Sequence, residues 1–545
     1  MSNSSTSSSF LAAGVGAAVA VAAVRLISHG IPAFLGQLGR SPRQKYQDLA
    51  DKLRDVAALE GAAGLLSWDE MVMMPPEAAA VRGKQKAALA GVLHEQSTSP
   101  DLGKLIHALS AANKDEFNDY EKAVIELARR DFKRKSSITK DLAKEIAELE
   151  SSAMQAWVEA RKASDFSKFA PFLERWVSIS RTKASMIDPS RPPYDVLMEE
   201  FEPGMTSARI DEIFAELKAG VVPLLEELRS GSKPDASFMA GMKVSVEKQA
   251  ELSRKIAKDM GFDFAKGRMD VSVHPFTGGT HPTDVRITSR YQEADMREGL
   301  MATIHETGHA LYEQGRNLEY DGLPVNAALS MGLHESQSLL WERMVALSKP
   351  FMSYLLPKAV ADIPALEGPN SNVDALYARL NEINEPSLIR VESDEVTYPL
   401  HIVIRYEIEK ALVEGSMKVK DVPKEWNTRM QQYFGYQPQD DAKGCLQDVH
   451  WSAGAFGYFP TYTLGAMYAC QIFRKAEKDI PNLATSISAG RFKDLKEWLN
   501  KSIHEKGSVF RSGDEIMKAV TGEPLNVAVF TSYLTQKYRG IYKLK

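Results

Sequence analysis

Cysteine is nearly absent from this 545-residue chain, which contains only Cys445 and Cys470. Two cysteines exclude a disulfide framework and a cysteine-rich zinc module. Neither sign of charge is in large excess, since 67 Lys and Arg stand against 72 Asp and Glu. The chain therefore lacks the excess of positive charge that attracts nucleic acid, and we expect no nucleic-acid partner. The composition is otherwise that of a globular protein, and the eleven histidines are the residues to search for chemistry.

Acidic residues are also missing from the first 47 residues, which open with a Ser/Thr-rich run. Acid-poor, Ser-rich and Arg-containing composition is typical of an organelle transit segment. Residues 10–24 are all apolar or glycine, but a membrane span needs about 20 such residues. We predict that residues 1–43 are a targeting or membrane-anchor segment and that residues 44–545 form one large domain. The predicted location is a chloroplast or mitochondrion, with a membrane-anchored or cytoplasmic location as alternatives, and any membrane contact is expected only through this segment.

The remaining chain has mostly helical periodicity. Apolar residues recur at three- and four-residue spacing in several stretches, which include Tyr46–Leu66, Asp115–Arg134, Leu142–Ala163 and Ile210–Leu228. One region instead alternates as strands do, over Met269–Val273 and Val285–Thr288, with Thr277–Thr280 as an expected turn. The pattern predicts a mainly α domain with a β-hairpin or small sheet.

A helix predicted over residues 294–312 contains the sequence His305-Glu306-Thr307-Gly308-His309. Histidines four residues apart lie on one helix face, so both imidazoles can reach one metal ion. Glu306 is offset by one residue, which lets its carboxylate reach a water at the metal without becoming a ligand. The motif predicts a catalytic zinc site, with Co²⁺ or another divalent ion as an alternative metal.

Catalytic zinc needs a third protein ligand and an open position for water. A second amphipathic helix, predicted over residues 325–347, carries Glu335 and Glu342 on one face. Two antiparallel helices would bring Glu335 against His305 and His309, so Glu335 is the predicted third ligand. Glu313 and Glu319 are alternatives in or beside the connecting loop.

Several spaced motifs together resemble one known family, the carboxypeptidase Taq metallopeptidases, over nearly the whole chain after residue 44. The motifs are Leu65–Asp69, Met73–Pro76, His274–Phe276, Asp284-x-Arg286-x-Thr288, His305–His309, His334–Gln337, Ile389–Asp394, Thr397–His401, Gly444–Trp451 and Thr521–Leu525. Two features depart from the family pattern: Ser393 stands where Ala is usual, and the N-terminal segment is an extension.

The resemblance implies a saddle-like helical fold of the gluzincin, neurolysin-like type, with a deep central groove, and a homodimer. It also implies zinc-dependent release of single C-terminal residues from peptides with broad specificity. His305, His309 and Glu335 carry over as metal ligands and Glu306 as general base. Arg390 corresponds to a residue that helps hold the substrate carboxylate. Asp284 and Arg286 correspond to a motif that narrows the groove.

Other residues are candidates for binding and catalysis. His450, Tyr458 and Tyr462 are predicted to stabilise the oxyanion, because the segment that holds them is dense in polar aromatic residues. Arg405 is a weaker alternative to Arg390 for the substrate carboxylate. The remaining candidates, His274 and His401, are predicted to orient ligands or to contact substrate.

Two other functions remain open from the sequence. The first is a gluzincin oligopeptidase or dipeptidyl carboxypeptidase, which would release dipeptides or internal fragments. The second is a catalytically silent, membrane-tethered scaffold. The intact set of His305, Glu306, His309 and Glu335 argues against the scaffold, which would have no need of the base.

Overall fold

The computed structural model describes residues 40–544 of the chain. The predicted targeting or anchor segment, residues 1–43, lies almost wholly outside the described residues. Within the described part, no helix is both long enough and apolar enough to cross a bilayer.

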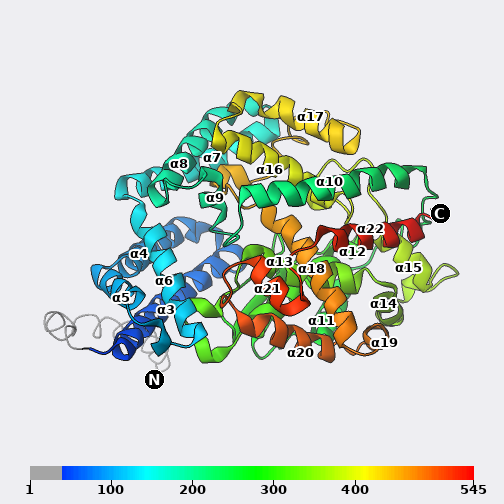
Figure 1. Cartoon of the computed structure of the whole chain (residues 1–545). Helices are drawn as coiled ribbons and strands as arrows, with labels where there is room; N and C mark the ends of the chain where they lie inside the picture. Colours follow the sequence, from blue (N-terminus) through cyan, green and yellow to red (C-terminus); the bar gives the residue numbers. More distant parts are fainter. Residues whose placement is uncertain (1–39, 545) are drawn as a thin grey trace, which may run out of the picture.

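Helices account for most of the described chain (Figure 1), and the mainly α prediction is confirmed. The first group comprises α3 (Pro42–Val72), α4 (Ala79–Ser97), α5 (Pro100–Ser110), α6 (Asp119–Ser137), α7 (Lys140–Ala163), α8 (Ala170–Ile187), α9 (Pro193–Met198), α10 (Ser207–Ser230) and α11 (Val246–Met260). After a small sheet follow α12 (Met296–Gln314), α13 (Met331–Leu339), a π-helical segment (Leu340–Ala346), α14 (Lys349–Asp362), α15 (Val373–Leu380), α16 (Tyr398–Glu414) and α17 (Val422–Phe434). The last group comprises α18 (Pro460–Asp479), α19 (Leu483–Ser488), α20 (Lys493–Ser502), α21 (Gly513–Thr521) and α22 (Val527–Ile541).

Polar side chains fix where several of these helices begin. The Ser41 hydroxyl accepts the backbone N–H of Gln44 and the Gln44 side chain accepts the N–H of Ser41, a reciprocal cap at the start of α3. The Asp295 carboxylate caps α12, and the Ser330 hydroxyl caps α13. The two helices predicted to carry the metal ligands therefore begin at defined residues.

The small sheet differs from the predicted hairpin. It has three strands, β1 (Gly267–Val271), β2 (Thr277–His281) and β3 (Asp284–Ser289), in the order β1-β3-β2, with β1 parallel and β2 antiparallel to β3. The segment Thr277–Thr280, predicted as a turn, is part of strand β2. Gly279 has φ of 145°, and its missing Cβ leaves room for the backbone of Asp284 and Val285. The sheet itself is confirmed, but the turn prediction was wrong.

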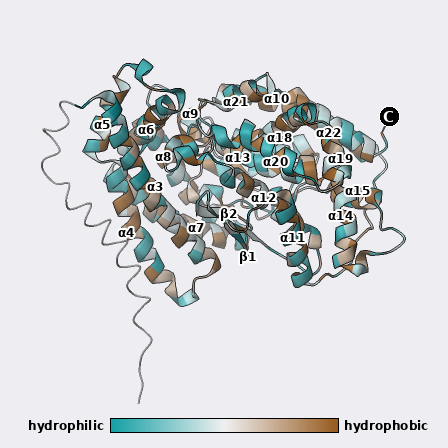
Figure 2. Cartoon of the chain, turned by 90° about the horizontal axis from the view of Figure 1, so that it is seen from below, coloured by the Kyte–Doolittle hydropathy of each residue, from teal (hydrophilic) through white to brown (hydrophobic). Residues whose placement is uncertain are grey.

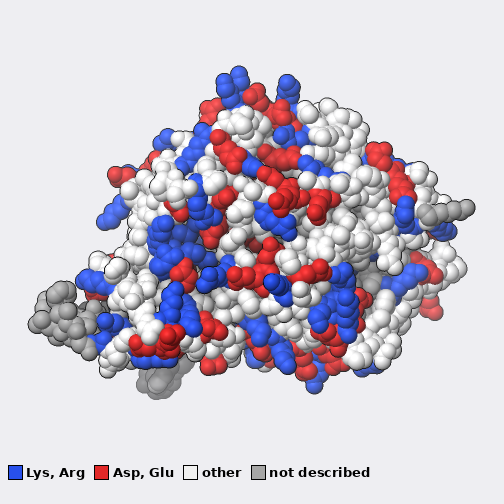
Figure 3. Space-filling model, in the orientation of Figure 1, with Lys and Arg blue, Asp and Glu red and all other residues white. Residues whose placement is uncertain are grey.

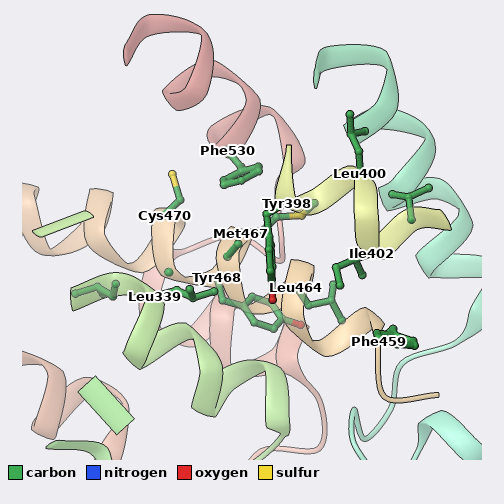
Figure 4. Close-up of a cluster of buried hydrophobic side chains, with 14 of the residues drawn as sticks. Leu339, Tyr398, Leu400, Ile402, Phe459, Leu464, Met467, Tyr468, Cys470 and Phe530 are labelled. Carbon is green, nitrogen blue, oxygen red and sulfur yellow. The ribbon is translucent and has the colours of Figure 1, made fainter. Parts of the chain in front are cut away.

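The core lies around α18, in the middle of the molecule. Buried side chains of α13, α16, α18 and α22 meet there, including Leu339, Leu400, Leu464 and Phe530 (Figure 4). Cys470 is one of these side chains, and both cysteines are buried and free, as small apolar residues commonly are.

The N-terminal helices α3 to α6 lie to one side of this core, and α14, α15 and α19 lie to the other (Figures 1 and 2). The sheet lies beneath α12, between the two sides (Figure 2). On the face drawn in Figure 3, Lys and Arg are interspersed with Asp and Glu.

Candidate metal centre

The three predicted metal ligands converge. One ligand atom each from His305, His309 and Glu335 lies within 4.8 Å of the other two. The Glu335 carboxylate oxygen is 3.2 Å from Nε2 of His309 and 3.7 Å from Nε2 of His305. The histidines come from α12 and the glutamate from α13. Within residues 40–544, no other group of three or more His, Cys, Asp or Glu side chains could hold a metal ion.

Each histidine is oriented through its other ring nitrogen. Nδ1 of His305 is 2.6 Å from the Glu342 carboxylate, on the π-helical segment. Nδ1 of His309 shares a 2.7 Å hydrogen bond with His334, whose Nε2 is 2.9 Å from Glu313. Partners of this kind fix the ring orientation and leave Nε2 directed at the metal position. Glu313, one of the alternative ligands predicted from the sequence, therefore contacts His334 and not the metal position. The other alternative, Glu319, is exposed.

The charges at this centre are mutually dependent. Burial disfavours the ionised form of Glu335, but the adjacent His305 and His309 lower its pKa to about 2. Burial likewise disfavours protonated His305, but Glu335 and Glu342 raise its pKa to about 10. A proton on His305 thus supplies positive charge between two carboxylates, and a divalent cation would displace it on binding.

Glu306 lies beside the three ligands without belonging to them. The Thr277 hydroxyl donates to one carboxylate oxygen at 2.6 Å and is 3.0 Å from the Glu306 backbone carbonyl oxygen. Glu306 is 7% exposed. The contact from β2 holds one carboxylate oxygen and leaves the other for proton transfer.

Close approach of three helices fixes the position of Glu335. A Cβ on Gly308 would lie 2.6 Å from the Ser338 Cα, so α12 and α13 touch at the backbone. A Cβ on Gly465 of α18 would lie 2.9 Å from the Cβ and Cγ of Glu335. At the start of α13, the buried Glu202 carboxylate accepts the backbone N–H of Gly332 at 2.5 Å.

Gly308→Ala is expected to destabilise the protein by about 1–3 kcal/mol, because the added methyl group meets backbone rather than a movable side chain. Chemical denaturation measures the free energy of unfolding. The matched control is Gly83→Ala on α4, where a Cβ would meet nothing within 4 Å, and it should be neutral or stabilising by up to about 1 kcal/mol. Equal stability of the two variants would contradict a tight α12–α13 contact.

Glu342→Ala is expected to weaken divalent-metal affinity by about 10- to 100-fold, since His305 would lose the acceptor that orients it. Competition against a chromophoric chelator measures the affinity. Glu342→Gln keeps an acceptor oxygen and should lose less. Unchanged affinity in the Ala variant would show that Glu342 does not orient the ligand.

The predicted carboxylate-binding arginine is held by an aspartate. The Arg390 Nε and one terminal nitrogen are 2.9 and 2.8 Å from Asp448, and the guanidinium carbon is 5.0 Å from the Tyr462 ring centroid. Arg405 binds the other Asp448 oxygen at 2.5 Å and is completely buried over Trp426. Arg405 thus braces Asp448 from within the core, and Arg390 lies nearer the polar aromatic residues.

Those aromatic residues form one cluster. Nε2 of His450 is 3.1 Å from the Tyr462 hydroxyl, and the Tyr458 and Tyr462 ring centroids are 5.3 Å apart. Burial lowers the pKa of His450 to about 4 and raises the pKa of Tyr458 to about 12. At neutral pH the imidazole is therefore neutral and the phenol protonated, so both can donate hydrogen bonds.

Asp284 and Arg286 pair with each other on β3. Nε of Arg286 is 2.8 Å from one Asp284 oxygen, and its guanidinium carbon is 5.8 Å from the Trp68 ring centroid of α3. The pair therefore lies where the sheet faces α3. Asp284 also lines a pocket of about 880 Å³ between α3, the sheet and the α12–α13 connection.

Neither His274 nor His401 forms a hydrogen bond with His305, His309 or Glu335. His274 is exposed in the connection between β1 and β2. His401 is completely buried, with its ring 4.6 Å from Phe434 and Nε2 3.2 Å from the Ser387 hydroxyl. A direct contact between His401 and substrate is excluded in this conformation, because the side chain has no accessible surface.

Three functional contacts were missed from the sequence. Thr277 was assigned to a turn, so its hydrogen bond to Glu306 was not foreseen. The orienting roles of His334 and Glu342 were also missed, although Glu342 was placed on the same helix face as Glu335. The signal for Glu342 was its spacing of seven residues from Glu335, two helical turns along.

Comparisons with known proteins agree with this centre. The family model described as carboxypeptidase Taq (M32) metallopeptidase matches residues 48–538. Carboxypeptidase 1 of Bacillus subtilis is 39% identical over 499 residues, which cover 91% of this chain and 99% of that protein. Thermostable carboxypeptidase 1 of Thermus thermophilus is 39% identical over 92% of this chain and 100% of that protein.

A solved structure has the same fold. The crystal structure of an M32 carboxypeptidase from Deinococcus radiodurans superposes with a TM-score of 0.88 at 32% identity, covering 92% of this chain and 100% of that one. The match of the family model over most of the chain, together with these relatives, shows the family directly. The chain belongs to the carboxypeptidase Taq family and is a metallocarboxypeptidase, a hydrolase of peptides.

Proposed function

We propose that this protein is a zinc-dependent carboxypeptidase that removes single residues from the free C-terminus of peptides, with broad specificity. One observation carries the proposal: His305, His309 and Glu335 offer ligand atoms within 4.8 Å of one another, with Glu306 next to His305 on the same helix. The broad specificity for the released residue is proposed from the resemblance to the carboxypeptidase Taq family.

The residues fit a catalytic zinc ion. Two imidazoles and one carboxylate are a known three-ligand set for catalytic zinc, which keeps a further position for water or substrate. Imidazole ligands also favour zinc over magnesium or calcium, while Co²⁺ remains an alternative for the same donors. When bound, such a cation lowers the pKa of a water molecule and polarises the scissile carbonyl group.

Glu306 acts as the general base and then the general acid. Its free carboxylate oxygen takes a proton from the attacking water, while Thr277 holds the other oxygen at 2.6 Å. The same oxygen then delivers the proton to the nitrogen of the leaving amino acid. The C–N bond breaks, and the products are a shortened peptide and one free amino acid.

The aromatic cluster stabilises the oxyanion that forms on the scissile carbonyl. The Tyr458 and Tyr462 hydroxyls are protonated at neutral pH because burial raises the pKa of each. Fixed donors at the place where negative charge develops are worth several kcal/mol in other hydrolases. His450 holds the Tyr462 hydroxyl at 3.1 Å and so orients one donor.

Arg390 binds the free carboxylate of the C-terminal residue. Asp448 occupies one edge of its guanidinium group and fixes its plane. A guanidinium group can bind carboxylate through two parallel hydrogen bonds, a geometry that Lys cannot offer. This contact distinguishes a free C-terminus from a peptide bond further along the chain.

Two further proposals concern assembly and location. We propose a homodimer, which sedimentation would show as a species of twice the chain mass. We also propose that residues 1–43 direct the protein to a chloroplast or mitochondrion. The acid-poor, Ser-rich composition supports this location, and N-terminal sequencing of the mature protein tests whether the segment is removed.

Product analysis tests the proposed activity. An N-terminally blocked heptapeptide with a free C-terminus should lose one residue at a time, whereas the same peptide with a C-terminal amide should be cleaved far more slowly. Chelation should stop the reaction, and added Zn²⁺ should restore it. Release of dipeptides or internal fragments would instead indicate a dipeptidyl carboxypeptidase or an oligopeptidase.

A further inference from the structure

The pocket of about 880 Å³ beside the metal centre has walls from three parts of the chain. One wall is the α3 segment from Arg54 to Leu65, and a second is β2 with its turn into β3. The third wall is the end of α12 and the connection toward α13, as far as Gly322, together with His334 of α13. This volume is near the upper end of the range for small-molecule binding sites, so the pocket has room for several peptide residues and not only for one side chain.

This pocket is lined by residues that contact the metal ligands and Glu306. His334 and Glu313, which line it, hold the ligand His309. Thr277, which also lines it, donates to Glu306. The proposed carboxylate-binding Arg390 and the oxyanion donors are absent from its lining. A peptide whose last residue lies at Arg390 would therefore extend its preceding residues toward the pocket.

The charges on the walls are unbalanced. Five carboxylates line the pocket, against two guanidinium groups, a net charge of −3 with the histidines neutral. The carboxylates belong to Glu60, Asp284, Glu313, Glu319 and Asp321, and the guanidinium groups to Arg54 and Arg316.

Most of the cations near the pocket are already engaged. Arg316 pairs with Glu313 at 2.6 Å, and Arg286 pairs with Asp284. Arg54 donates to the backbone carbonyl of Asp321 and lies 3.5 Å from Asp51, outside the pocket. Lys135 lies 3.7 Å from Glu60, in a pair exposed on both sides.

Two carboxylates have no Arg or Lys partner within the described residues. Asp321 pairs only with His281, at 2.9 Å, and Glu319 forms no ion pair. Both lie on the α12–α13 connection, which forms part of the third wall of the pocket. The wall that they form can therefore accept a positive side chain without displacing an internal cation.

We propose that this pocket binds the peptide residues that precede the cleaved residue and prefers Lys or Arg among them. Glu319 and Asp321 attract the positive side chain and determine this preference. The inference rests on the proposed carboxypeptidase activity, because that activity gives the peptide its direction through the site.

Matched substrates test the preference. Blocked Ala-rich heptapeptides share one C-terminal residue and carry a single Lys or a single Glu at the third, fourth or fifth position from the C-terminus. The Zn²⁺-loaded full chain should show a KM roughly five- to tenfold lower for Lys than for Glu at one or more of these positions. Its kcat should be similar for both, and the difference in KM should shrink as salt is raised.

The double variant Glu319→Gln/Asp321→Asn should reduce the KM difference to within about twofold, because it removes both charges and keeps the side-chain shapes. The matched control is Glu150→Gln/Glu159→Gln, two exposed glutamates of α7 outside the pocket, and it should keep the wild-type preference. Circular dichroism and metal content verify that both variants are folded and loaded.

Each result decides between defined alternatives. Equal KM for Lys and Glu peptides in the wild type, or a preference that the double variant retains in full, would overturn the pocket's role. Either result would leave the carboxypeptidase activity standing, since single residues would still be released. Release of no residue from any peptide would overturn the proposed activity, and the pocket's role with it.

Discussion

Glu306→Gln is expected to lower kcat for peptide hydrolysis by about 10²- to 10⁴-fold, the range of general acid–base catalysis. Gln keeps the shape of the side chain and an oxygen that can accept from the Thr277 hydroxyl, but it cannot take a proton from water. Metal content should remain that of the wild type, because Glu306 is outside the ligand set. Steady-state kinetics with metal analysis on the same sample measure both quantities.

Thr277→Val serves as the control for that variant. It removes the hydroxyl that donates to the Glu306 carboxylate but leaves the carboxylate itself. Its kcat should therefore fall between those of the wild type and Glu306→Gln. A Glu306→Gln enzyme that hydrolyses peptides at the wild-type rate would exclude Glu306 as the base.

Glu335→Ala is expected to lower the affinity for Zn²⁺ by more than about 100-fold and to abolish activity at limiting metal. Loss of an orienting partner alone typically costs 10- to 100-fold, and Glu335 contributes a ligand atom. Its carboxylate oxygen also lies close to Nε2 of both histidines, at 3.2 Å from His309 and 3.7 Å from His305. Chelator competition measures the affinity of the folded variant.

Glu319→Ala is the matched control for ligand loss. Glu319 was the exposed alternative for the third ligand, on the connection that follows α12. Its removal should leave Zn²⁺ affinity unchanged. Loss of metal in Glu319→Ala, with retention in Glu335→Ala, would reverse the ligand assignment.

The metal ligands could be predicted from the sequence because their geometry is local. Histidines four residues apart share a face in any α-helix, so His305 and His309 needed only the helical periodicity around them. Glu335 needed one further step, an antiparallel second helix, which the Gly315–Pro324 connection permits. Two of the helices predicted from the apolar spacing, Tyr46–Leu66 and Ile210–Leu228, lie within α3 and α10.

Contacts that depend on packing were not predictable in the same way. The glycines of Thr277–Thr280 favoured a turn, yet they form an edge strand against α3. A Cβ on Gly64 of α3 would lie 2.8 Å from the Gly279 carbonyl oxygen, so the missing side chain of Gly64 allows the two backbones to approach closely. Nothing in the periodicity of either segment indicates the other.

The burial of individual polar residues could not be predicted from the sequence either. His401 and Arg405 are completely buried on α16, although both were candidates for contact with substrate from the sequence. The burial of Arg405 is offset by Asp448, 43 residues later, whose carboxylate binds both Arg390 and Arg405. The π-helical segment that carries Glu342 is likewise set by packing, and such segments are frequent at functional sites.

X-ray absorption at the zinc edge of the loaded enzyme would show which side chains bind the metal. We predict one zinc ion per chain, bound by two imidazole nitrogens and carboxylate oxygen from one residue, with at least one further oxygen from exchangeable solvent. The Glu335→Ala variant should no longer show zinc bound by these ligands. A zinc ion enclosed by four protein side chains, or a spectrum with fewer than two imidazoles, would contradict a catalytic site formed by His305, His309 and Glu335.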